Sequence, residues 1–264
     1  SWAMAKGFPQ YPQDLSAPLE IPLNLAGSFG ELRKNHYHAG WDLKTDERVG
    51  LKVLAIADGE IVRVKVAPDG YGLAVYVAHD QWSITSVYAH LSDFKPELAQ
   101  WVREQQYQLK QFAVDLSTPK GLFRVKRQEV VGWSGNSGSS AGPHLHFEIR
   151  NTLTEHPLDP HLLGYTLADI TRPVIQRMWL IPQEAGETPL SLDFNFGGEA
   201  YGKDSLYEVA AVFGVGIEVY DYVLSADNQC GIQHMITLLD GNIISEWQID
   251  SIDFNKTHHV NSHI

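Results

Sequence analysis

The stretch "AGPHLHFEIR", residues 141–150, alternates apolar and polar side chains and places two histidines on either side of one leucine. In a β-strand, side chains two residues apart share a face. The leucine, phenylalanine and isoleucine of this run are therefore expected to pack on one face, and His144, His146 and Glu148 to lie on the other. Such a face can coordinate a metal or exchange protons. The simpler alternative is an edge strand with a solvated polar face.

A glycine- and serine-rich loop, "GWSGNSGSSAGP" at residues 132–143, leads into this predicted strand. Loops that enter rigid strands commonly carry functional sites, because the scaffold holds them in place while their backbone stays adaptable. This context favours a functional face over a solvated edge.

The composition limits the classes of protein to consider. The chain has 264 residues, which allows one large domain or two medium ones, and its 44% hydrophobic and 20% charged residues are ordinary for a globular protein. A net charge of −12 argues against a nucleic-acid partner. No apolar run approaches the roughly 18 residues of a transmembrane segment. The single cysteine, Cys230, excludes an internal disulfide, and the start "SWAMAKGFPQ" lacks the pattern of a signal peptide.

The first two thirds of the chain read mainly as strands. Residues 50–91 form a series of short β-like runs with an Asp58-Gly59 turn, which predicts a curled antiparallel sheet. Residues 95–116 differ, because apolar residues recur there near helical spacing: Leu98, Val102, Leu109, Phe112 and Leu116. One helix is therefore expected to interrupt a β-domain.

The pattern changes after about residue 168. Prolines mark breaks, further strand-like runs follow, and Asp240-Gly241 has the signature of a hairpin turn. We expect a mainly β protein with two domains, one over residues 1–168 and a smaller β-sandwich-like domain over 169–264. The abrupt end at "HVNSHI" suggests that the second domain is incomplete.

A second group of candidate ligands stands near the start, in "NHYHAGWDL" at residues 35–43. His38 and Asp42 share a face of an extended strand, and Gly40 between them permits close backbone approach. A catalytic zinc site commonly has three protein ligands and a water. His38, Asp42 and one histidine of the later pair would supply them, and the other histidine would lie beside the water. His90, in "VYAHLS", ends another predicted strand and is a further candidate.

These segments, in this order, resemble the lysostaphin/LytM-type zinc endopeptidases from about Phe29 to Pro160. The resemblance is carried by "SFGELRKNHYHAGWD", "VLAIADGEIVRV", "YGLAVYVAHD", "VYAHLS" and "VGWSGNSGSSAGPHLHFEIR". It implies a curled antiparallel β-sheet domain that cuts peptide stems or cross-links of bacterial peptidoglycan. It also implies a place in the cell envelope, either periplasmic or secreted.

The resemblance assigns roles to five residues. The zinc ligands of the family fall on His38, Asp42 and His146, and its two catalytic histidines fall on His90 and His144. No position of this set is substituted. The degenerate relatives that activate other hydrolases are therefore the less favoured comparison.

Three other residues compete for roles. His36 shares a predicted face with His38, but the Gly-x-Asp after His38 favours the latter as the ligand. Glu148 lacks the helical His-Glu-x-x-His context of a zincin base, so a hydrogen bond to a ligand or a surface ion pair is the expected role. His79 is expected to be structural, with possible support of the site.

About 30 residues more than a minimal family core lie at about 93–126, including the predicted helix. This insertion either governs access to the site or is a peripheral helix packed on the sheet. If it covered the site, the protein would be a shielded or non-hydrolytic module that binds the cell wall or controls a partner hydrolase. That is the alternative to the peptidase function.

Overall fold

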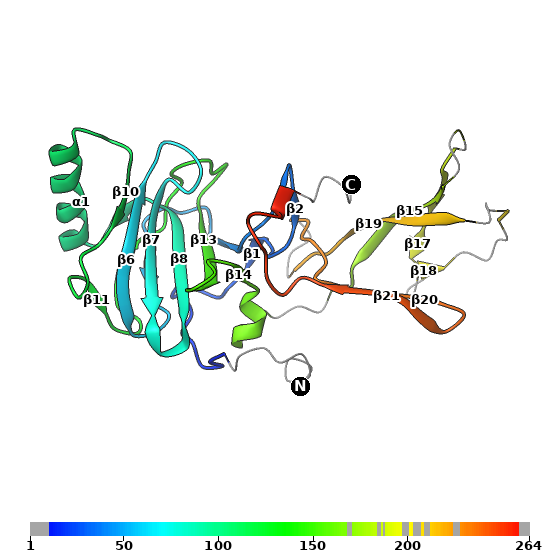
Figure 1. Cartoon of the computed structure of the whole chain (residues 1–264), viewed down its shortest axis with the longest axis horizontal. Helices are drawn as coiled ribbons and strands as arrows, with labels where there is room; N and C mark the ends of the chain where they lie inside the picture. The colour runs from blue at the N-terminus through cyan, green and yellow to red at the C-terminus, as the bar shows by residue number, and fades with distance from the viewer. Residues whose placement is uncertain are drawn as a thin grey trace.

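The computed structural model describes residues 11–167, 171–183, 186, 188–196, 201–202, 207–208, 212–223 and 228–258. The fold is mainly β with antiparallel sheets, as the sequence predicts (Figure 1). The largest sheet has nine strands: β1 (Leu25–Gly27), β4 (Trp41–Lys44), β6 (Gly59–Val66), β7 (Leu73–His79), β8 (Ile84–Leu91), β10 (Val114–Ser117), β11 (Arg124–Val125), β13 (His144–Asn151) and β14 (Pro157–Leu158). Seven of them follow the order β1-β4-β13-β8-β7-β6-β10, while β14 pairs with β13 and β11 with β6.

Smaller elements complete this part of the chain. It also contains a three-stranded sheet and a two-stranded sheet. Their strands are β5 (Lys52–Leu54), β12 (Val130–Trp133) and β9 (Asp93–Phe94), and β2 (Leu32–Arg33) and β3 (His36–Tyr37). Two short 3-10 helices are η2 (Asp80–Trp82) and η3 (Pro160–Leu163).

Strand β13 has the alternation that its sequence predicts. Leu145, Phe147 and Ile149 have no exposed surface and lie in the main hydrophobic core. His146 and Glu148 point to the opposite face, where a smaller cluster of buried apolar side chains lies. The main core therefore holds the strand in register, and a one-residue slip would exchange the two faces.

The predicted helix exists but is shorter than expected. Helix α1 spans Pro96–Leu109 and ends at Lys110, which has a left-handed backbone with φ of 54°. Phe112, which is 73% exposed, lies outside the helix, and Leu116 belongs to β10. The prediction ran too far because the apolar residues of the following strand continued the helical spacing by chance.

The position of helix α1 bears on the two expected roles of the insertion. Leu98, Ala99 and Val102 of α1 join the main core, on the face of the sheet opposite His146. Strand β10 pairs with β6, and three strands, β8, β7 and β6, separate β10 from β13. In Figure 1 the helix lies at the end of the molecule away from the C-terminal strands. Helix α1 is thus a peripheral element packed on the sheet, while control of access by the whole insertion stays a prediction.

We expect Leu98→Ala to lower the free energy of unfolding by about 2–5 kcal/mol, because it opens a cavity in the main core. Leu98 has no exposed surface. The matched control is Leu109→Ala on the same helix, where the side chain is 50% exposed and the expected change is about 0.5 kcal/mol or less. Urea unfolding followed by circular dichroism measures both. Equal effects of the two substitutions would contradict the position of α1.

The C-terminal third is also built of antiparallel strands. Its strands are β15 (Val174–Pro182), β16 (Leu190–Asp193), β17 (Asn195–Phe196), β18 (Tyr201–Gly202), β19 (Phe213–Tyr220), β20 (His234–Leu239) and β21 (Asn242–Gln248). β15 lies between β16 and β19, and β20 pairs with β21. Asp240 and Gly241 make the predicted turn with positive φ at both residues. The boundary expected at 168/169 lies outside the described residues, and the β-sandwich stays a prediction. Within the described part of the chain, no helix is long and apolar enough to cross a membrane.

Candidate metal centre

Strands β4 and β13 bring the predicted ligands together. In their antiparallel register His146 lies directly opposite Asp42. The two backbones can approach because Gly40 has no side chain: a Cβ there would lie 2.3 Å from the carbonyl oxygen of Phe147. The close approach expected of this glycine is confirmed, and it explains why a glycine stands between His38 and Asp42.

Three donor atoms converge on one point. His38 Nε2 lies 3.1 Å from Asp42 Oδ1 and 3.2 Å from His146 Nδ1, and the last two atoms are 2.8 Å apart. All three residues are buried. Zinc bonds of about 2.0–2.1 Å in a tetrahedron separate neighbouring ligand atoms by about 3.3 Å. The grouping is therefore compatible with a metal site, in chemistry and in size.

The ring nitrogens that face away from this point have their own partners. His38 Nδ1 donates to the carbonyl oxygen of Ser28 at 2.7 Å, and His146 Nε2 donates to a carboxylate oxygen of Glu148 at 2.8 Å. Each of these bonds places a proton on the outer nitrogen, so the inner nitrogen is the one that would bind a metal. Histidines that bind metals are commonly oriented in this way.

Glu148 is the centre of a buried polar network. It has no exposed surface, and it accepts hydrogen bonds from Arg150 Nε at 2.6 Å and from the Tyr71 hydroxyl. Burial alone would raise the pKa of Glu148, but the charge of Arg150 and the hydrogen bond from His146 lower it to about 2. Glu148 is thus a carboxylate that orients His146. The hydrogen bond expected from the sequence is present, and it is buried rather than a surface ion pair.

The carboxylate of Asp42 is held from both sides. Its Oδ2 accepts a hydrogen bond from an Arg33 nitrogen at 3.1 Å, while its Oδ1 faces the histidines. Burial opposes the charge of Asp42, but the contacts of its carboxylate with His144, His146 and His38 keep its pKa well below the usual range. The group is therefore an anion, which is the form that binds a cation.

His90 reaches the site because of a β-bulge. Tyr88 pairs with Val75 and Leu91 with Leu73, so β8 has one residue more than β7 over this interval. Alternation would have placed His90 on the core face with Tyr88. The positive φ of His90, 59°, turns its ring toward the site, 4.8 Å from the ring of His144 between centroids.

The loop at 132–143 orients both of these histidines. His90 Nδ1 donates to the carbonyl oxygen of Ser137 at 2.8 Å, and His144 Nδ1 donates to that of Gly142 at 2.8 Å. His144 Nε2 lies 3.4 Å from Asp42 Oδ1. Burial, together with the neighbouring histidines, lowers the pKa of His90 to about 4. The His90 ring is therefore neutral at pH 7.

The competing histidines lie elsewhere. His36 is exposed, with its Nδ1 3.1 Å from the carbonyl oxygen of Lys34, and it is outside the cluster. His79 is fully buried and bonds to the Asp58 carbonyl and the Ser86 hydroxyl, so its role is structural, without contact to the site.

Three supporting residues were missed from the sequence. Ser28 acts through its backbone carbonyl, which no side-chain motif reveals. Tyr71 donates a hydrogen bond to Glu148, and Arg33 donates one to Asp42. Both residues occur inside the segments that carry the family resemblance, and this position was the signal that could have identified them.

Replacing Glu148 by Gln should weaken zinc binding about 10- to 100-fold, since the partner that fixes the His146 ring loses its charge. The matched control is Glu155→Gln, because Glu155 also pairs with Arg150, at 3.2 Å, but is 55% exposed. Competition with a chromophoric chelator measures both affinities. Equal zinc affinity in the Glu148 variant and the wild type would show that the network does not support the ligand.

Part of this chain is similar to known metallopeptidases. Peptidase family M23 matches residues 36–107. An uncharacterized metalloprotease of Haemophilus influenzae is 30% identical over 162 residues, which cover 61% of this chain and 29% of that protein. The DD-carboxypeptidase/endopeptidase Mpg of Neisseria meningitidis is 30% identical over 135 residues, 51% of this chain and 24% of that protein.

A solved structure, the catalytic domain of lysostaphin from Staphylococcus simulans, aligns with 24% identity and a TM-score of 0.37, covering 51% of this chain and 86% of that one. The chain spans less than a third of the length of the two relatives named above. The family match includes His38, Asp42 and His90, three of the five residues gathered at the site. Residues 36–107 are thus similar to peptidase family M23.

Proposed function

We propose that this protein is a zinc-dependent endopeptidase that hydrolyses amide bonds in the peptide stems or cross-links of bacterial peptidoglycan. The observation that carries the proposal is the convergence of His38 Nε2, Asp42 Oδ1 and His146 Nδ1, each with its outer atoms already bonded. Two histidines and one carboxylate make the donor set of many catalytic zinc sites.

The chain's own residues supply the remaining chemistry. Zinc held by these ligands would polarise a carbonyl and acidify water. His90 is neutral at pH 7 because its pKa is lowered to about 4, and its Nε2 is free to accept a proton. His144 stands beside it with Nδ1 anchored on Gly142. We assign to this pair the transfer of a proton from water to the leaving amine.

The names of similar proteins support the class of substrate. Besides Mpg, the glycyl-glycine endopeptidase ALE-1 of Staphylococcus capitis is 30% identical over 119 residues, 43% of this chain and 24% of that protein. We therefore place the protein in the cell envelope, either periplasmic or secreted, with a peptidoglycan peptide as its partner. We also propose that residues 1–168 form the peptidase domain and 169–264 an accessory β-domain.

Digestion of purified peptidoglycan, with mass spectrometry of the released fragments, tests this function. The expected result is release of muropeptides cut at one amide position, abolished by a chelator and restored by added zinc. Intact peptidoglycan after incubation with the zinc-loaded protein would refute the hydrolase and favour the wall-binding alternative. That alternative depends on an insertion that covers the site, and α1 packs instead in the main core.

A further inference from the structure

A short C-terminal segment, Cys230–Gln233, lies against the loop that orients the ligand His38. The segment is anchored by two backbone hydrogen bonds between Cys230 and Asp221, at 2.7 and 2.9 Å. Asp221 directly follows β19, so this anchor joins the segment to the C-terminal sheet. Cys230 is only 2% exposed, which shows that the segment is packed rather than loosely attached.

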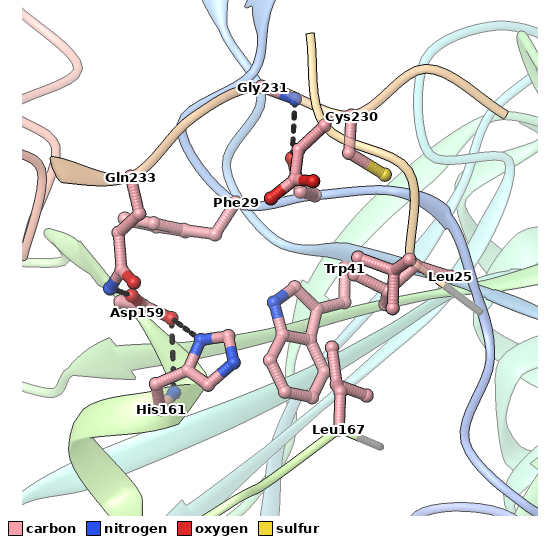
Figure 2. Close-up of a pocket in the computed structure, with 12 residues that line it drawn as sticks. Leu25, Phe29, Trp41, Asp159, His161, Leu167, Cys230, Gly231 and Gln233 are labelled. Atoms are coloured by element: carbon pink, nitrogen blue, oxygen red, sulfur yellow. Dashed lines mark hydrogen bonds and ion pairs between the residues drawn. The ribbon is translucent and has the colours of Figure 1, made fainter. Parts of the chain in front are cut away.

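One residue connects this segment to the metal centre. The backbone N–H of Gly231 donates to the Ser28 hydroxyl at 3.0 Å, and the Ser28 carbonyl accepts the hydrogen bond from His38 Nδ1 at 2.7 Å. Figure 2 shows the first of these bonds above Phe29, with Trp41 below. Ser28 thus touches the C-terminal segment through its side chain and the ligand through its backbone.

The same loop reaches a second ligand. The Ser28 N–H donates to a carboxylate oxygen of Glu31 at 3.2 Å, and the Glu31 carboxylate pairs with Arg33 Nε at 2.8 Å. Arg33 in turn donates to Asp42 Oδ2 at 3.1 Å. A shift of the loop would therefore move the partners of both His38 and Asp42.

Tight packing makes Gly231 hard to replace. A Cβ on this residue would lie 2.9 Å from the Cα of Glu31, a backbone atom that cannot rotate away. Gln233, two residues on, donates to the buried carboxylate of Asp159, which also accepts from His161 (Figure 2). The segment is thus fixed at both ends of its contact with the first part of the chain.

We propose that Ser28 and Gly231 are positioning residues through which the C-terminal β-region sets the affinity of the metal centre. This inference rests on the proposed zinc function. It extends that function because Gly231, far outside the matched residues 36–107, would then influence the metal site. The C-terminal region is then a structural component of the peptidase, since it buttresses the loop on which His38 depends.

The test compares Gly231→Ala with Gly216→Ala. Gly216 lies in β19, where a Cβ would find its nearest neighbours at 3.5 Å or more, an ordinary contact. We expect the Gly231 variant to bind zinc about 10- to 100-fold more weakly and to change the visible absorption bands of the cobalt-substituted protein, which report ligand geometry. The Gly216 variant should keep the wild-type affinity and spectrum. Wild-type affinity and spectrum in both variants would overturn the inference.

A second pair of variants separates positioning from general damage. Ser28→Ala removes the hydroxyl that Gly231 bonds but keeps the carbonyl that orients His38, and Ser28→Thr restores a hydroxyl. We expect weaker zinc binding in the alanine variant and recovery in the threonine variant, with similar unfolding curves of the metal-free proteins. Unchanged affinity in Ser28→Ala would overturn the inference even if Gly231→Ala failed to fold. A wild-type protein that binds no zinc would instead refute the proposed function itself.

Discussion

Zinc content is expected to fall from one ion per chain to nearly none when His38, Asp42 or His146 is replaced by alanine. Each residue contributes one of three donor atoms separated by 2.8–3.2 Å, so its loss leaves only two protein ligands for the metal. Loss of an outer partner costs about 10- to 100-fold in metal affinity, and loss of a ligand should cost more. Elemental analysis after dialysis against a weak chelator measures the outcome.

The control for this experiment is His36→Ala. His36 lies two residues before His38 but is exposed and outside the cluster, so its variant should keep one zinc per chain. A ligand variant that retains a full zinc ion would remove that residue from the ligand set. Loss of zinc in the His36 variant would mean that the hairpin of β2 and β3, and not the imidazole of His38, is what zinc binding requires.

Periodicity predicted the faces of the sheet but not every side chain of the site. Strand β13 follows simple alternation, so the positions of His144 and His146 could be predicted from the residues alone. His90 could not, because a bulge and a positive φ reverse its face, and neither is encoded in a two-residue period. Its place at the end of a predicted strand made it a further candidate, and the family resemblance assigned its catalytic role.

Backbone groups account for most of what the sequence could not reveal. The carbonyls of Ser28, Ser137 and Gly142 fix the protons of three histidines, yet a carbonyl is present at every residue. Only the fold determines which of them points at an imidazole. The contact between Gly231 and Ser28 was equally hidden, since it joins residues 203 positions apart.

Removal of either His90 or His144 should reduce hydrolysis by about a hundredfold or more and leave one zinc per chain. Neither histidine belongs to the three-donor grouping. Both rings are held by backbone carbonyls of the 132–143 loop, which contributes none of the three zinc ligands. Turnover of a defined muropeptide, together with zinc content, separates this effect from metal loss.

The two variants should also differ from the ligand variants in their response to added metal. Excess zinc raises occupancy in a protein with a weakened site, but it cannot replace a proton acceptor, so activity of His90→Ala and His144→Ala should stay low at saturating zinc. A suitable control is His36→Ala, since His36 is exposed and lies outside the cluster. Wild-type turnover in either variant would exclude that histidine from the reaction. Recovery of turnover by added zinc alone would mean that the replaced histidine supports metal binding, because excess zinc restores only a loss of metal affinity.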